Sequence, residues 1–184
     1  FTTVATNPCG EIPLCPYDSC RLLAINLLSY VDKPFTKEAS FNFEKFKQHV
    51  EKAMRMMDDI IDLELEKIEL IINKIAADPE DEDIRRVELE LWKKIRTMAR
   101  KGRRTGLGIT AEGDMLAALG LRYGTPEATA FAVKVQKTLA LEAYRASVKM
   151  AAERGAFEIF DARKEEKNPM IGRIREADPE LYAE

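Results

Sequence analysis

Apolar residues recur at helical spacing through an unusually long part of this chain. Between about residues 43 and 77 they return every three or four positions, which predicts one long helix, or two in line, with a single apolar stripe. The stripe consists of Phe46, Val50, Ala53, Met57, Ile60, Ile61, Ile68, Ile71, Ile72 and Ile75. The fold is therefore expected to be mainly α with a few short β-strands.

A second helix is predicted after a polar break. Residues 78 to 83 contain Pro79 and five acids, a composition that indicates a solvated turn. The pattern resumes from Ile84 to Arg100, and Gly102 is expected to end this helix. Its apolar stripe contains Val87, Leu91, Ile95 and Met98.

The last third of the sequence predicts a strand followed by helices. Residues 105 to 110 have the glycine and β-branched content of a strand, and a short helix should follow from about 111 to 119. Thr125-Pro126-Glu127 is a strong helix start, and Gly155 is a natural stop. The face expected to be buried contains Phe131, Val135, Leu139, Ala143 and Met150. Residues 156 to 161 could form a short strand, and the remainder is predicted to be a polar helix-turn tail.

Helix is excluded from the first twenty residues but not from the apolar segment that follows them. Pro8, Pro13 and Pro16 exclude a helix from residues 1 to 20, which predicts loop and short strand. Residues 21 to 31 are almost continuously apolar, and this pattern fits a buried helix and a buried strand equally well.

Composition excludes several classes of protein. The chain has 184 residues, 46% of them hydrophobic, and a net charge of −3, which is ordinary for one folded domain and gives no basic footprint for nucleic acid. No apolar run approaches the roughly 20 residues that cross a bilayer, and no signal segment begins the chain. Three cysteines, an odd number, indicate at least one free thiol. These observations predict a cytoplasmic protein with no nucleic acid or membrane partner.

One short motif points to chemistry. The run Asn7-Pro8-Cys9-Gly10-Glu11 places an amide, a thiol and a carboxylate at alternate positions, which in an extended segment would face the same side. A thiol can give up hydrogen, a carboxylate can move a proton, and an amide can hold a substrate hydroxyl. Asn7, Cys9 and Glu11 are therefore candidate catalytic residues, with Cys20 as a second thiol eleven positions after the first.

Two simpler interpretations compete with a reactive loop. Cys9, Cys15 and Cys20 could bind zinc with His49, but their spacing is not that of a Cys-x2-Cys site, so no metal site is predicted. His49 is expected to be a solvated or capping side chain. Alternatively the motif is ordinary loop, and Cys9 is a small buried hydrophobe.

The motifs resemble the catalytic subunits of ribonucleotide reductases. Asn7 to Glu11, followed by Cys20 to Leu27 in the pattern Cys-x-Leu-x-x-Ile-Asn-Leu, is similar to the finger loop of the class II, adenosylcobalamin-dependent branch. Residues 102 to 110 and 114 to 124 resemble the Gly-rich strand and following helix of the same domain. Arg21-Leu22-Leu23-Ala24 departs from the commoner Asn-Leu-Gly-Ser.

The resemblance implies a mechanism and a set of partners. Cys9 would become a thiyl radical and remove hydrogen from C3′ of a ribonucleoside diphosphate or triphosphate. Glu11 would take the 3′-hydroxyl proton, Asn7 would hold the sugar hydroxyls, and Cys20 would be half of the reducing pair. Adenosylcobalamin in the full-length parent would start the radical, and a thioredoxin-like or other external dithiol would reset the disulfide. The product would be a deoxyribonucleotide for DNA synthesis, and Cys15 receives no role.

The resemblance also implies how much of the enzyme is present. The chain starts at Phe1 close to the motif, so it is expected to be an internal fragment of the ten-stranded α/β barrel of ribonucleotide reductase, inactive alone. Residues 1–184 would form a single partial domain: a finger loop and buried segment (1–34), a long helical region (35–101) and a Gly-rich strand, helices and tail (102–184). Part of residues 63 to 99 is expected to be an insertion. The partners would be the remainder of the parent chain and a possible second copy; the alternative is a non-catalytic helical interaction or regulatory module.

Overall fold

The computed structural model describes residues 3–10, 12–19 and 21–184. Its backbone groups into two compact units. We call residues up to 21 together with 56–106 and 155–160 the loop-and-hairpin unit. Residues 22–55, 107–154 and 161–184 are the core unit. Among the described residues, no helix combines the length and the apolar character needed to span a bilayer.

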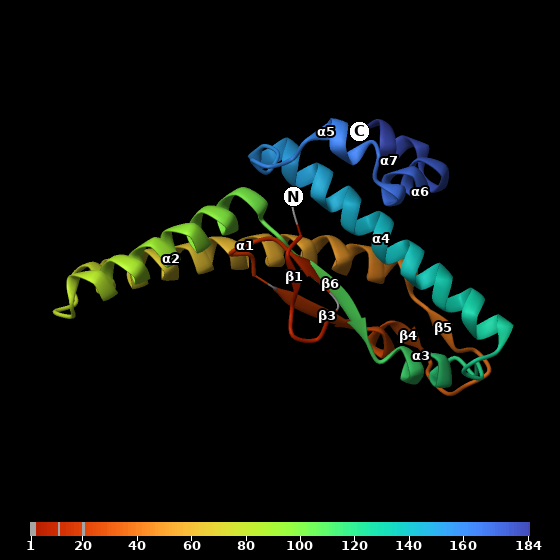
Figure 1. Cartoon of the computed structure of the whole chain (residues 1–184). Helices are drawn as coiled ribbons and strands as arrows, with labels where there is room; N and C mark the ends of the chain where they lie inside the picture. The colour runs from red at the N-terminus through yellow and green to blue at the C-terminus, as the bar shows by residue number, and fades with distance from the viewer. Residues whose placement is uncertain (1–2, 11, 20) are drawn as a thin grey trace. The chain divides into compact units, whose positions relative to one another are not determined.

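The loop-and-hairpin unit is built from a β-hairpin and a helical hairpin. Strands β1 (Ala5–Thr6) and β2 (Pro13–Leu14) pair antiparallel, with Ala5 opposite Leu14. Helix α1 (Phe43–Ala76) enters the unit at residue 56, and α2 (Glu82–Gly102) returns beside it (Figure 1). The predicted long helix, the polar turn and the second helix are confirmed.

The turn and the end of α2 have identifiable caps. Asp81 caps the start of α2, because its carboxylate accepts a hydrogen bond from the backbone N–H of Asp83 at 2.9 Å. Arg103 ends the helix in the left-handed conformation, with φ of 41°. Gly102 is the last helical residue, so the expected stop lies one position earlier than the observed cap.

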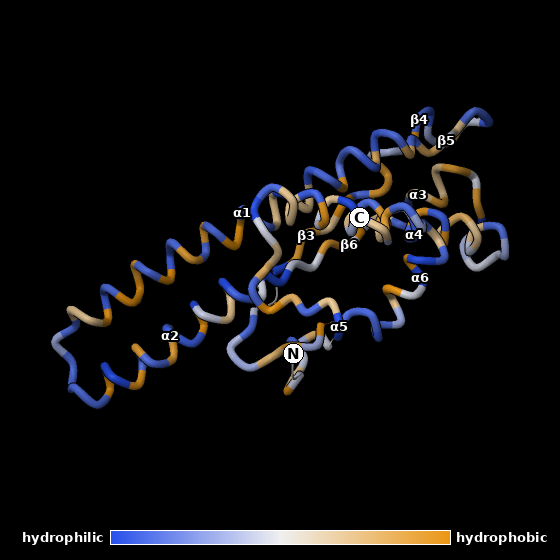
Figure 2. Tube along the Cα trace, turned by 90° about the horizontal axis from the view of Figure 1, so that it is seen from above, coloured by the Kyte–Doolittle hydropathy of each residue, from blue (hydrophilic) through white to orange (hydrophobic). Residues whose placement is uncertain are grey.

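The helical hairpin buries a narrower stripe than its sequence suggests. Along the second part of α1 the buried apolar positions are Met57, Ile61, Ile68, Ile72 and Ile75. Ile60 is exposed, and so are Val87 and Leu91 of the α2 stripe. Two helices cover only one face of each other, so apolar residues just outside the contact stay in solvent. Figure 2 shows hydrophilic and hydrophobic residues alternating along both helices.

The core unit combines short strands with several helices. Strand β3 (Leu22–Asn26) pairs with β6 (Gly106–Thr110), and β4 (Val31–Asp32) pairs antiparallel with β5 (Ser40–Phe41). A 3-10 turn, Leu27–Tyr30, follows β3. The helices are the first part of α1, α3 (Glu112–Ala118), α4 (Pro126–Arg154), α5 (Ala162–Glu165), α6 (Pro169–Ala177) and α7 (Pro179–Ala183).

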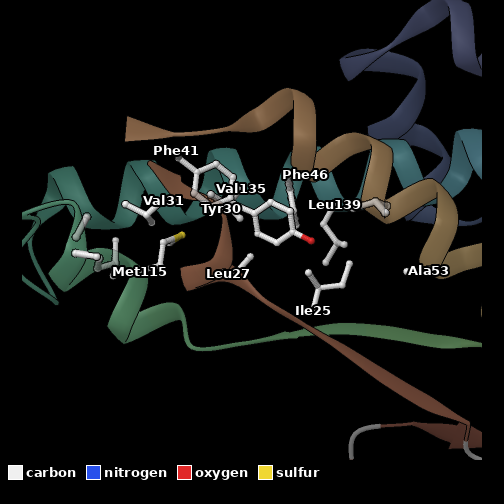
Figure 3. Packing of buried hydrophobic residues seen from close by; sticks show 14 residues of the cluster. Ile25, Leu27, Tyr30, Val31, Phe41, Phe46, Ala53, Met115, Val135 and Leu139 are labelled. Atoms are coloured by element: carbon white, nitrogen blue, oxygen red, sulfur yellow. The ribbon is translucent and has the colours of Figure 1, made fainter. Parts of the chain in front are cut away.

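Aromatic side chains lie at the centre of the core unit. The ring centroid of Tyr30 lies 5.1 Å from that of Phe46 and 5.9 Å from that of Phe41, and Val135 and Leu139 of α4 belong to the same cluster (Figure 3). Burial raises the pKa of the Tyr30 phenol. This hydroxyl lies 3.0 Å from Nδ1 of His49. His49 is therefore a half-buried hydrogen-bonding partner, and the expectation of a solvated or capping histidine is wrong.

Two local expectations are decided by the structure. The ambiguous apolar segment from residue 21 to 31 forms strand β3 and then the 3-10 turn. The strand expected at residues 156 to 161 is wrong: this segment is a turn in which Phe160 N–H donates to the Phe157 carbonyl at 2.9 Å. The rings of Phe157 and Phe160 contact each other there, which explains the apolar pattern. The described residues form a mainly helical fold with a few short strands, as expected.

Candidate active site

The motif residues form the tip of the β1–β2 hairpin. Asn7 N–H donates to the Ile12 carbonyl at 3.1 Å and continues the pairing of the strands. Gly10 N–H donates to the Asn7 carbonyl at 3.0 Å, so residues 7 to 10 make a β-turn with Pro8 in its second position, where proline is favoured. Gly10 has a φ of +80°, a conformation that glycine adopts without strain.

The expected extended geometry is therefore wrong in this segment. The turn places Asn7 and Cys9 in different surroundings, because Asn7 is buried whereas Cys9 is exposed. The Asn7 side chain closes the loop, since its Oδ1 accepts a hydrogen bond from Ile12 N–H at 2.9 Å. Alternating side-chain directions hold only in a strand, and the motif uses its proline and glycine to turn.

The structure distinguishes the two cysteines that it describes. Cys9 is a free, exposed thiol at the tip of the turn. The interpretation of Cys9 as a small buried hydrophobe is thus wrong. Cys15 is free and buried, and its Sγ lies 3.8 Å from Nη2 of Arg104. Glu11 and Cys20 lie outside the described residues, so the roles assigned to them stay predictions.

The segment before residue 20 is fixed by an arginine from the end of the helical hairpin. Nε of Arg104 donates to the carboxylate of Asp18 at 2.5 Å, and the Asp18 side chain is almost fully buried. Sequence reasoning missed this residue, because no local pattern relates Arg104 to Asp18, which lies 86 positions earlier in the chain.

The segment after residue 20 is fixed by a second arginine. Arg21 is buried, and its Nε donates to the carboxylate of Glu64 on α1. Its Nη1 donates to the Arg104 carbonyl at 3.1 Å, and its own carbonyl accepts from Gly106 N–H at 2.9 Å. The departure from the family pattern at residue 21 was the sequence signal for this contact, but nothing in the sequence named Glu64 as its partner.

A third arginine ties the end of α2 to α1. Arg103 donates through Nε to Asp58 at 2.6 Å, through Nη2 to the Asp58 carbonyl at 3.0 Å, and through Nη1 to Asp62 at 2.8 Å. Burial by itself lowers the pKa of Arg103, but the hydrogen bonds to both carboxylates outweigh it and the net pKa lies above its ordinary value. Arg103 therefore stays charged at all working pH values.

The described part of the site contains a free thiol. In the residues that the structure describes, no group of three or more histidine, cysteine, aspartate or glutamate side chains could hold a metal ion. What the described part presents is one accessible thiol on a closed turn, next to a segment fixed by buried ion pairs.

Curated relatives share most of this sequence but are much longer. The chain is 31% identical over 156 residues to a vitamin B12-dependent ribonucleoside-diphosphate reductase of Mycobacterium tuberculosis, covering 85% of this chain and 18% of that protein. It is 35% identical over 153 residues to a protein of the same name from Thermoplasma acidophilum, covering 83% and 16%. The chain thus spans less than a fifth of the length of these relatives.

A family model extends the similarity over nearly the whole chain. The model described as the ribonucleotide reductase barrel domain matches residues 2–174, which include the Cys9 turn, the helical hairpin and the β3–β6 pair. A match over so much of the sequence decides the family: the chain belongs to the barrel-domain family of ribonucleotide reductases.

Proposed function

We propose that the chain is part of the catalytic subunit of an adenosylcobalamin-dependent ribonucleotide reductase, which converts ribonucleotides to deoxyribonucleotides. The observation that carries the proposal is the exposed Cys9 thiol, held at the tip of a turn that Asn7 closes, within a family match over residues 2–174. A thiol that must meet a sugar ring needs both accessibility and a fixed position.

The relatives support a substrate class and a place in the barrel for this chain. Both relatives named above are vitamin B12-dependent ribonucleoside-diphosphate reductases, which supports a diphosphate substrate. We assign β3 and β6 to the ten-stranded α/β barrel of the complete enzyme, with the other strands supplied by the remainder of the parent chain. On this view residues 1–184 alone are inactive.

Each reactive residue of the loop would have a separate chemical role. As a thiyl radical, Cys9 takes the hydrogen atom from C3′ of the ribose, while Asn7 helps to hold the sugar hydroxyls. Glu11 takes the 3′-hydroxyl proton, and the 2′-hydroxyl leaves as water with a proton from the reducing pair. Cys20 and a partner thiol supply two electrons, deliver their second hydrogen to C2′ and become a disulfide; Glu11 then returns the proton to the 3′-oxygen and Cys9 returns the hydrogen atom to C3′.

The exposed Cys9 thiol is the group that the cofactor would activate. Adenosylcobalamin, when bound, would supply the unpaired electron that is passed to the Cys9 sulfur. An accessible thiol at a loop tip fits that requirement, whereas a buried one would not. We assign no described residue to cofactor binding.

The proposed partners follow from the thiol chemistry. A thioredoxin-like or other external dithiol would reduce the Cys20 disulfide after each turnover. Reactive thiols need a reducing compartment, so we place the enzyme in the cytoplasm. A homodimer is the simplest assembly for such a subunit.

Cysteine variants of the full-length reductase test the proposal. Cys9→Ser should abolish turnover with every reductant, because serine cannot give up a hydrogen atom in this way. Cys20→Ser should stop the enzyme after about one turnover when an external dithiol is the only reductant. Cys15→Ser is the matched control and should keep turnover. Deoxyribonucleotide formation with and without adenosylcobalamin is the readout, and continued turnover of Cys9→Ser would refute the proposal.

A further inference from the structure

We propose that the helical hairpin is a self-association surface, through which α1 pairs antiparallel with α1 of a second copy of the chain. The proposal rests on the homodimer of the proposed function and names the surface that forms it. The two copies of α1 would meet at Leu70, and the two hairpins together would form a four-helix bundle.

The second part of α1 carries two apolar faces, of which the hairpin uses one. Ile61, Ile68 and Ile72 are buried, whereas Leu63 and Leu70 are 58% and 60% exposed. Leu70 follows Ile68 by two positions, which places it on nearly the opposite side of a helix with 3.6 residues per turn. Leu63 and Leu70 lie seven residues apart on the same face, which is the spacing of a coiled-coil seam.

Helix α2 has a similar excess of apolar surface. Its residues Ile84, Val87 and Leu91 are exposed and recur at spacings of three and four positions, so they form one stripe. Exposed apolar surface of this extent marks an interaction site. In a two-helix hairpin each helix needs one apolar face, whereas each helix of a four-helix bundle packs against two neighbours. The pattern of both helices therefore fits a bundle of four.

The charges around Leu70 identify the occupant of this face as a second copy. Glu66 lies four positions before Leu70 and Lys74 four positions after it, so both exposed side chains share its face. When two copies of α1 pair antiparallel about Leu70, Glu66 of each copy lies opposite Lys74 of the other. Lys67 lies opposite Asn73, so no like charges meet there. A surface that complements itself is what a two-fold interface requires.

The remainder of the parent chain fits this face less well. Part of residues 63–99 is predicted to be an insertion relative to the family pattern, so the surfaces that family members share have no counterpart for it. Opposite charges at equal distances on the two sides of Leu70 are required by self-pairing and by no other arrangement of one copy.

Charge reversal in the full-length reductase tests the pairing, and sedimentation velocity over a range of protein concentrations is the readout. The variants are Glu66→Lys, Lys74→Glu and the double change. Each single reversal turns both opposite-charge pairs into like-charge pairs, and the double reversal restores them with the signs exchanged. Leu70→Glu removes the central apolar contact. Its matched control is Val133→Glu on α4, because Val133 is also 60% exposed.

We expect each single reversal to raise the dimer dissociation constant about ten-fold at low salt, and less at high salt, because salt screens exposed charges. The double reversal should return the constant to within about three-fold of the wild type, and an equimolar mixture of the two single variants should form a heterodimer. Leu70→Glu should weaken the dimer roughly hundred-fold, as expected at the centre of an interface, whereas Val133→Glu should not. The melting temperatures of the monomers should not change, because all these positions are exposed.

Three results would overturn the inference. They are a monomeric wild type, a dimer that is as strong with Leu70→Glu as with Val133→Glu, and a double reversal that is as weak as the single ones. The second and third results would refute this surface and leave the proposed reaction standing. Turnover by Cys9→Ser would refute the proposed reaction whatever the state of the dimer, so the two failures are distinguishable.

Discussion

Replacing Arg103 by alanine should destabilise the loop-and-hairpin unit by about 3 kcal/mol. The guanidinium makes two contacts with Asp58, whose side chain is 12% exposed, and one with Asp62, which is 52% exposed. Removing one partner from a buried pair costs about 3–5 kcal/mol, and we take the lower end because Asp58 keeps some contact with water. The Asp62 contact adds about 0–1 kcal/mol at most.

Urea unfolding followed by tryptophan fluorescence measures this loss. Trp92, the one tryptophan of the chain, lies half-buried on α2 and therefore reports the same unit. Arg86→Ala is the matched control, since Arg86 lies on the same helix and forms exposed pairs with Asp83 and Glu90. The control should change the free energy of unfolding by less than about 0.5 kcal/mol. Equal losses in the two variants would refute the reasoning from burial.

Two further predictions concern the core unit. Phe46→Ala should lower the free energy of unfolding by about 3–5 kcal/mol, measured by circular dichroism in urea, whereas Phe35→Ala, at an exposed ring, should cost little; similar costs would contradict the core assignment. The hydrogen bond from Arg55 lowers the pKa of Glu153 below its ordinary value of 4.5, so this pair stabilises the fold above that pH and the contribution is lost as the pH falls through the lowered pKa. Glu153→Gln should therefore weaken the acid dependence of the melting temperature, and an unchanged dependence would count against the pair.

Periodicity and caps were enough to predict most helices. The apolar repeat placed α1, and proline and glycine signals placed both ends of α4 within a residue or two. Local signals failed where a contact distant in sequence decides the outcome. The hydrogen bond between His49 and Tyr30 forms only when α1 packs on the 3-10 turn. In the turn after Gly155, the rings of Phe157 and Phe160 contact each other.

The candidate site was also predictable from sequence only where its contacts are local. Residues 7 to 10 could be selected from sequence as a candidate reactive loop, but the extended geometry predicted for them is wrong. Alternating side-chain directions require a strand, whereas the Asn7 carbonyl accepts a hydrogen bond from Gly10 N–H and closes a turn. The arginine and glutamate partners could not be named, since pairing across 43 or 86 residues follows from how α1 and α2 pack. The one indication in the sequence was Arg21, where the chain departs from the commoner family pattern.

The turn that presents Cys9 and the residues that follow it are held by different means. The turn closes through contacts between residues 7 and 12, so its geometry is local. Asp18 and Arg21 pair with Arg104 and Glu64, just after and on the helical hairpin, so their positions depend on how α1 and α2 pack. Changes in the hairpin should consequently spare the geometry of the Cys9 turn, because none of the contacts that close it involves α1 or α2.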